Sequence, residues 1–223
     1  MGRGGRIAAG VAGAVLLALA LAQVLLPRLA ASRISSRVGR YGTVSSVSVS
    51  AWPAVQLLWG SVGSVRVRAK SLSLSPAQAA SLLWEARGVR SMEVSAQSVR
   101  VGSLQLTDAS LHKQGSALSA QALTSEAAVK EALPTGFDLR LLRSEGGEVE
   151  VQASGGLFGV GASVNAIAGG SEGKLVAHPI GFLVEALHLT LFSDPHVYVV
   201  GVGASVQSEQ PLSYRLTMTA RLH

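Results

Sequence analysis

The pattern closest to a catalytic motif in this chain is Gly169-Gly170-Ser171-Glu172-Gly173, which matches the G-x-S-x-G sequence of serine hydrolases. In those enzymes the serine lies on a strained turn between a strand and a helix, which exposes its hydroxyl beside an oxyanion hole. Here the motif is followed by Lys174–Ala177, whose sequence favours a strand. Because an ordinary hairpin explains these glycines, we expect no catalytic residue at Ser171.

The other polar residues lack the spacing of a metal or acid–base site. No two of the five histidines have the spacing of a helical metal site, and the chain contains no cysteine. Glu148 and Glu150 alternate as residues on the solvent face of a strand do. Gly155–Gly159 lacks the lysine and the helix of a phosphate loop. The sequence therefore predicts a protein that is not an enzyme and has no metal and no cofactor.

A segment suited to a lipid surface lies at Trp52–Gly60, where two tryptophans and several aliphatic residues occur together shortly before three cations. Indole rings favour the headgroup depth of a bilayer, and cations favour its phosphates. The alternative is that the aromatic residues close one end of a hydrophobic core. The candidate membrane and headgroup contacts are Trp52, Leu57, Leu58, Trp59, Arg66, Arg68 and Lys70.

The run from Ile7 to Leu26 is apolar except for Gln23 and follows Arg3 and Arg6. Twenty helical residues span roughly 30 Å, the thickness of the hydrocarbon core of a bilayer. The run fits either a signal peptide cleaved after Ala22 or an uncleaved anchor. Arginines on both sides leave the orientation ambiguous under the positive-inside rule. We expect export, with the protein at the cell membrane and its main domain on the extracytoplasmic side.

Charge is distributed unevenly along the chain. Residues 1–40 hold six arginines and no acid, which accounts for the whole net charge of +6. Residues 41–113 then carry seven basic and three acidic side chains, whereas residues 114–223 carry six and ten. The basic part suits an anionic lipid surface, although a solvated face would look the same. Nucleic acid is not expected as a partner, because no basic cluster is interleaved with aromatic residues.

From residue 43 onward, apolar residues recur with the period of two that is typical of strands. Val65 and Val67 belong to one such run, whose phase slips by one residue before Leu72, which predicts a bulge or a bend. Ser75 and Pro76 begin a predicted helix that runs to Arg87. The predicted strands are Val44–Ser50, Val65–Leu74, Met92–Ala96, Val99–Leu106, Phe137–Leu142, Glu148–Ala153, Phe158–Ala168, Lys174–Ala177, Val197–Val200 and Leu212–Leu222, and the other helices are Pro53–Trp59 and about 125–133.

These elements predict an α+β fold, in which a strongly twisted antiparallel sheet packs on a few short helices after an N-terminal membrane helix or signal peptide. The predicted divisions are a signal peptide or anchor over 1–27, a basic juxtamembrane helix over 28–42 and a single β-rich domain over 43–223. Two small helices cover little of such a sheet, so an apolar groove could hold an acyl chain. Its candidate lining residues are Val65, Val67, Leu72, Leu74, Leu104, Leu106, Leu139 and Val151.

The order of these segments over about residues 30–223 resembles the LmeA-like phospholipid-binding family of actinobacterial cell-envelope proteins. The segments that carry the resemblance are Val44–Ser50, Trp52–Gly60, Val65–Leu74, Ala122–Val129 and the glycine-rich hairpins before Leu175. The resemblance implies a tubular lipid-binding type of fold and an exported or membrane-tethered, non-catalytic phospholipid-binding protein that serves envelope assembly. The alternative from the residues is a structural domain that binds a protein partner in an envelope complex and holds no lipid.

Overall fold

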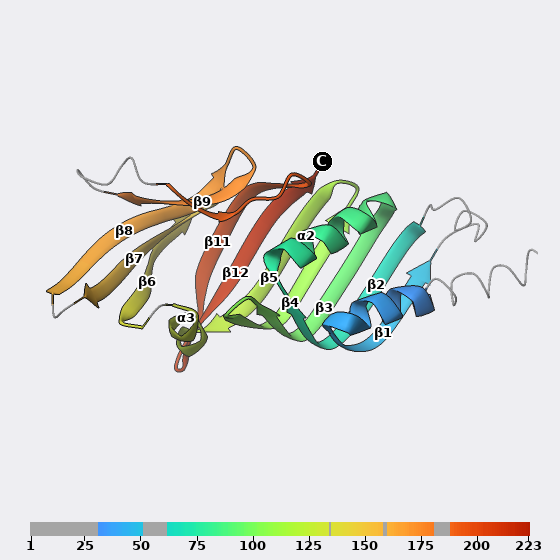
Figure 1. Ribbon diagram of the computed structural model, residues 1–223, viewed down its shortest axis with the longest axis horizontal. Coiled ribbons are helices and arrows are strands. Elements are labelled where there is room, and N and C mark those ends of the chain that lie inside the picture. The colour runs from blue at the N-terminus through green and yellow to red at the C-terminus, as the bar shows by residue number, and fades with distance from the viewer. Residues whose placement is uncertain (1–30, 51–61, 134, 158–159, 181–187) are drawn as a thin grey trace, which may run out of the picture.

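The computed structural model describes residues 31–50, 62–133, 135–157, 160–180 and 188–223, which form two β-sheets and three short α-helices. The seven-stranded sheet has the order β1-β2-β3-β4-β5-β12-β11, and the five-stranded sheet has the order β10-β9-β8-β7-β6 (Figure 1). The strands of the first sheet are β1 (Gly42–Ser50), β2 (Val62–Leu74), β3 (Val89–Val101), β4 (Leu104–Gln114), β5 (Ala117–Ser125), β11 (Val197–Glu209) and β12 (Leu212–Leu222). Those of the second are β6 (Phe137–Glu145), β7 (Glu148–Leu157), β8 (Val160–Ser171), β9 (Lys174–Ile180) and β10 (Leu189–Phe192).

The predicted β-rich α+β class is confirmed, but the sheet arrangement differs from the prediction in two respects. The strands form two sheets instead of one, and β2 and β3 pair in parallel within an otherwise antiparallel set. The parallel pair arises because helix α2 (Pro76–Glu85) and the 3₁₀ turn η3 (Ala86–Gly88) return the chain to the end at which β2 began. Two strands, β5 and β10, were not predicted, and the predicted strand Val99–Leu106 is wrong, because the turn at Gly102 and Ser103 divides it between the end of β3 and the start of β4.

Two helices lie over one side of the seven-stranded sheet, which we call the inner face (Figure 1). The helix over residues 31–38 packs Ala31, Ile34 and Val38 onto the cluster formed by Val65, Val67 and Val49. Helix α2 packs Ala80 and Leu83 among inner-face residues of β5, β11 and β12. Arg37 and Glu85 form an ion pair at 2.5 Å that joins the two helices.

The predicted slip in the β2 alternation is a β-bulge. Thr43 of β1 pairs with Ser71, but Val44 pairs with Ala69, so Lys70 has no partner in β1. Strand β3 changes phase at the same level, because Ala69 pairs with Ala96 and Leu72 with Val99. The two strands therefore keep their apolar residues on the inner face along their whole length.

The predicted helix at 76–87 is present and begins with the predicted capping box. The backbone N–H of Gln78 donates to the Ser75 hydroxyl at 3.2 Å, and the Ser75 N–H donates to the Gln78 side-chain oxygen at 2.8 Å. These reciprocal bonds satisfy two donors that the first turn of a helix leaves free. The predicted short helix at Pro53–Trp59 lies outside the described residues.

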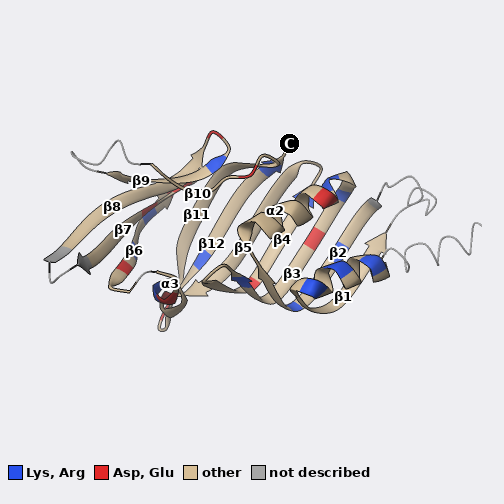
Figure 2. Ribbon diagram, in the orientation of Figure 1, with Lys and Arg blue, Asp and Glu red and all other residues tan. Residues whose placement is uncertain are grey.

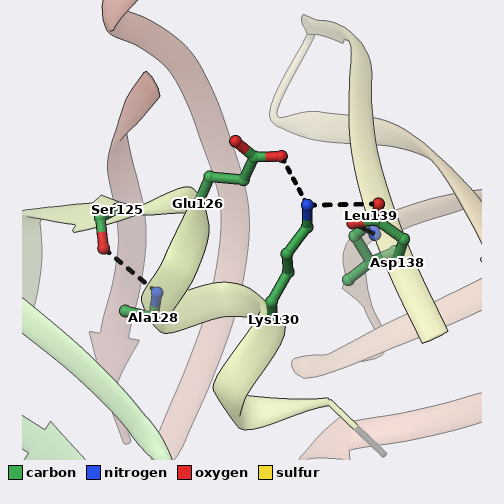
Figure 3. Close-up of polar contacts among 6 residues, drawn as sticks. All are labelled: Ser125, Glu126, Ala128, Lys130, Asp138 and Leu139. Atoms are coloured by element: carbon green, nitrogen blue, oxygen red, sulfur yellow. Dashed lines mark hydrogen bonds and ion pairs between the residues drawn. The ribbon is translucent and has the colours of Figure 1, made fainter. Parts of the chain in front are cut away.

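Helix α3 (Glu126–Ala132) lies where the two sheets meet. The Ser125 hydroxyl accepts from the Ala128 N–H at 3.1 Å, which caps the first turn. Figure 3 shows Lys130 between two carboxylates, at 3.0 Å from Glu126 and 3.5 Å from Asp138. Since Asp138 belongs to β6, this cation joins α3 to the five-stranded sheet, and the two carboxylates raise its pKa.

The two sheets are joined along the free edge of β11, the last strand of the seven-stranded sheet. Its backbone N–H groups at Val199 and Val202 donate, each at 2.8 Å, to the carbonyls of Gly173 and Gly147, which lie in hairpin turns of the five-stranded sheet. The Ser144 hydroxyl accepts a third bond, at 2.9 Å, from the N–H of Ala204. These contacts satisfy donors that an edge strand would otherwise expose.

Candidate functional site

The inner face continues from the seven-stranded sheet onto the five-stranded sheet. Phe192 of β10 packs against the cluster around Ala80 and Val197 and lies opposite Leu175 of β9. Register then carries the same side of the sheet across β8, β7 and β6, since residues directly opposite each other share a face. One row of opposite residues on this side holds Leu139, Ala153 and Val164. The next row holds Leu141, Val151, Ala166 and Pro179. The result is one apolar surface that crosses both sheets.

Among the described residues, no helix covers the five-stranded part of the inner face (Figure 1). Phe137, Val164 and Leu189 therefore remain 41%, 39% and 63% exposed. The aliphatic residues between them are only half-buried. Apolar surface of this kind, open to water on a folded protein, is typical of binding sites.

The eight predicted lining residues all lie on the inner face, in three environments. Val65, Val67 and Leu72 are buried beneath the helix over 31–38 and the side chain of Val38. Leu74, Leu104 and Leu106 are half-buried where β2 and β4 run toward α3. Leu139 and Val151 are half-buried on the five-stranded sheet. Their role in binding lipid stays a prediction, and the last five are the ones whose side chains the structure leaves accessible.

The predicted cations Arg66, Arg68 and Lys70 lie on the opposite, outer face, because they alternate with the buried residues of β2. Arg66 pairs with Glu93 at 2.7 Å, and this hydrogen bond holds the pKa of the Glu93 carboxyl below its usual value. Within the described ranges, Arg68 and Lys70 form no ion pair. Their charges are therefore directed to solvent, or to a surface that approaches from the outer side. The other predicted membrane contacts, Trp52, Leu57, Leu58 and Trp59, lie outside the described residues.

The G-x-S-x-G segment is the hairpin between β8 and β9, as predicted. Glu172 and Gly173 have φ values of 50° and 78° and form its two-residue turn, which a strand precedes and another strand follows. Gly173 also lets the Tyr198 ring approach, since a Cβ there would lie 2.5 Å from that ring. The glycines thus serve the turn and the junction between the sheets. In the part of the chain that the structure describes, no three His, Asp or Glu side chains gather where they could hold a metal ion.

Lys113 is an inner-face residue that the sequence reasoning missed. It lies between Met92 and Leu118 in the sheet and is only 2% exposed. Its ammonium donates to the carbonyls of Arg87, at 3.3 Å, and Val89, and burial lowers its pKa. Its position in phase with the apolar residues of β4 was the available signal. The bonds attach β4 to the end of η3 and thus fix the chain that follows α2.

No helix within the described ranges is both long and apolar enough to cross a bilayer, and the predicted segment over 1–27 lies outside them. A family model described as LmeA-like phospholipid-binding matches residues 17–220. Searches of curated proteins and of solved structures gave no match. The match extends over most of the chain and includes both sheets. This chain therefore belongs to the LmeA-like phospholipid-binding family.

Proposed function

We propose that this protein binds phospholipid non-catalytically on the extracytoplasmic side of the cell membrane, tethered or delivered there by its N-terminal segment, and handles lipid during envelope assembly. The observation that carries the proposal is the apolar inner face, which crosses both sheets and, among the described residues, has no helix over its five-stranded part. The family supports phospholipid as the ligand.

The acyl chain lies on the accessible part of the inner face, along Leu139, Val151 and Val164. A chain on this surface covers side chains that are otherwise 39–63% exposed, such as Val164 and Leu189. Each methylene removed from water contributes roughly 0.8 kcal/mol. Affinity therefore comes mainly from the length of the acyl chain, and Arg66, Arg68 and Lys70, on the outer face, contact the phosphates of the membrane instead of the bound lipid.

The test compares two substitutions at adjacent exposed positions on opposite faces of β8, Val164→Glu and Ser163→Glu. The full-length protein is extracted in mild detergent and analysed by native mass spectrometry with lipid extraction. We expect phospholipid at a stoichiometric level on the unmodified protein and on Ser163→Glu, and a marked loss on Val164→Glu, because its carboxylate would face the acyl chain.

A photoreactive acyl chain gives a second, positional readout. Cross-links should map to peptides of β6, β7 and β8 that carry inner-face residues. Equal lipid retention in both variants would refute the proposed position of the chain. A protein that stays free of lipid after incubation with envelope lipids would refute phospholipid binding itself and would support the alternative, a domain that binds a protein partner in an envelope complex.

A further inference from the structure

The fold separates charge along the long axis of the molecule. Residues of the seven-stranded part, 31–50, 62–133 and 197–223, carry 13 basic and 6 acidic side chains, a net charge of +7. The described residues of the five-stranded part, within 135–196, carry 3 basic and 6 acidic side chains, a net charge of −3. The sequence alone does not show this division, because β11 and β12 come last in the chain but lie in the basic sheet.

Toward the β1 end of the seven-stranded sheet, basic residues occur without acidic ones. Between residues 31 and 84 the chain has no aspartate or glutamate, and Glu85 is its first acid. The described residues among them form the helix over 31–38, β1, β2 and most of α2, and Figure 2 shows the colour of Lys and Arg, without that of Asp and Glu, along that helix and β2. Four cations in this region form no ion pair with any described residue. They are Arg33, Arg40, Arg68 and Lys70.

These four cations flank both sides of the β1 edge. Arg33 and Arg40 belong to the helical segment on the inner side, whereas Arg68 and Lys70 project from the outer face of β2. A membrane against the outer face would leave the helical cations out of reach, and a membrane against the helices would leave the β2 cations out of reach. Contact through the β1 edge brings both pairs to the lipid phosphates.

We propose that the protein docks end-on, with the β1 edge and its flanking cations on an anionic bilayer surface and the five-stranded sheet directed away from it. The inference builds on the proposed function, which supplies the membrane. The first described residue after the predicted membrane segment, Ala31, also packs at this end, on the cluster of Val49, Val65 and Val67. Anionic lipid attracts the +7 part and repels the −3 part, so the field orients the whole molecule.

End-on docking fixes the orientation of the inner face relative to the membrane. Six inter-strand spacings of about 4.8 Å separate β1 from β11 and add up to about 29 Å, with the five-stranded sheet beyond them. The accessible apolar surface around Val164 and Leu189 is therefore held well outside the headgroup layer of the membrane on which the protein docks.

The test uses single cysteines in the full-length protein, which has none of its own. Ser46→Cys on β1 and Gln121→Cys on β5 both mark exposed positions on the outer face, four strand spacings or about 19 Å apart. Each carries an environment-sensitive dye, and the protein is reconstituted in nanodiscs of phosphatidylcholine with or without phosphatidylglycerol. A quencher attached to lipid headgroups reports the proximity of each dye to the membrane.

End-on docking predicts strong quenching at Ser46→Cys, weak quenching at Gln121→Cys, and a contrast that grows with phosphatidylglycerol. Equal quenching at both positions would indicate docking by the flat outer face, and no quenching at either would indicate docking by the helices. Either result would overturn the proposal. So would a contrast that does not depend on anionic lipid.

Charge variants supply a matched control. Each Lys or Arg near an anionic surface changes a binding constant about 5-fold, so replacing Arg40, Arg68 and Lys70 by Gln should lower the ratio of docked to undocked orientation by about 100-fold. Replacing Arg140, Arg143 and Lys174 by Gln removes the same charge from the five-stranded sheet, beyond β11, and should preserve the contrast. Equal effects of the two triple variants would refute the proposal.

Lipid retention, measured on the same samples by native mass spectrometry, separates this inference from the proposed function. Retained lipid without a quenching contrast would refute only the orientation. A contrast without retained lipid would support the orientation and refute phospholipid binding.

Discussion

The junction between the sheets depends on the absence of a side chain at Gly170. A Cβ at this position would lie 2.8 Å from the Val200 carbonyl oxygen and 2.9 Å from that of Val199. Both are backbone atoms of β11, so neither can rotate away as a flexible side chain would. The substitution Gly170→Ala must therefore push β8 and β11 apart.

The expected cost follows from two contributions. Inserting a methyl group into a packed contact typically costs about 1–3 kcal/mol. Separation also lengthens the bonds from Val199 to Gly173 and from Val202 to Gly147, both 2.8 Å, and each such bond contributes about 0.5–1.5 kcal/mol. Since the bonds are weakened and not all lost, we expect Gly170→Ala to lower the free energy of unfolding by about 2–4 kcal/mol.

The assay is urea unfolding of the full-length protein in detergent, combined with hydrogen exchange at the amides of Val199 and Val202. We expect a lower midpoint and faster exchange at both amides. Gly39→Ala is the control, because a Cβ at Gly39 would meet no atom within 4 Å and the substitution should leave stability nearly unchanged. Wild-type stability and unchanged exchange in Gly170→Ala would refute the packing argument.

Three further predictions concern the helices and the buried lysine. Ser75→Ala removes the cap of α2 and should lower the free energy of unfolding by about 1 kcal/mol in urea titrations, whereas Ser75→Asp should retain most of it. Lys130→Met removes the link from α3 to Asp138, so hydrogen exchange in α3 should accelerate while exchange in β3 stays constant; uniform acceleration would contradict a local role. Burial lowers the pKa of Lys113, so the folded state loses this proton at a lower pH than the unfolded state does. The free energy of unfolding should therefore rise with pH between the lowered pKa and the ordinary lysine pKa of about 10.4. Urea titrations across this range should show a steeper rise for wild type than for Lys113→Met, and parallel curves would refute the assignment.

Features set by neighbouring residues could be predicted from the sequence. The capping box at Ser75 and the turn at Glu172 and Gly173 are local, so residue types alone determine them. The bulge at Lys70 could also be predicted, because a one-residue slip would otherwise turn Leu72 to the outer face. The same alternation placed all eight candidate lining residues on one side.

Features that depend on distant partners could not be predicted in this way. Alternation in a strand does not specify its neighbours, so the division into two sheets and the parallel pairing of β2 with β3 were not apparent. The small residues of β5, such as Ala120 and Ala122, give a weak periodic signal, and that strand was missed. The helix over 31–38 was predicted only as a juxtamembrane segment, so its cover over Val65 and Val67 was not foreseen.

The central position of β11 and β12 has a consequence for biosynthesis. These strands are made after the other ten, yet β12 completes the hydrogen bonding of β5 and β11 holds the hairpin turns of the other sheet. A nascent chain that has reached residue 196 therefore contains all five strands of one sheet but only β1–β5 of the other, whose β5 edge is still open. Such edges pair readily with other chains. Until the β11–β12 hairpin is made, the growing polypeptide depends on its rapid synthesis or on a holding chaperone to stay out of aggregates.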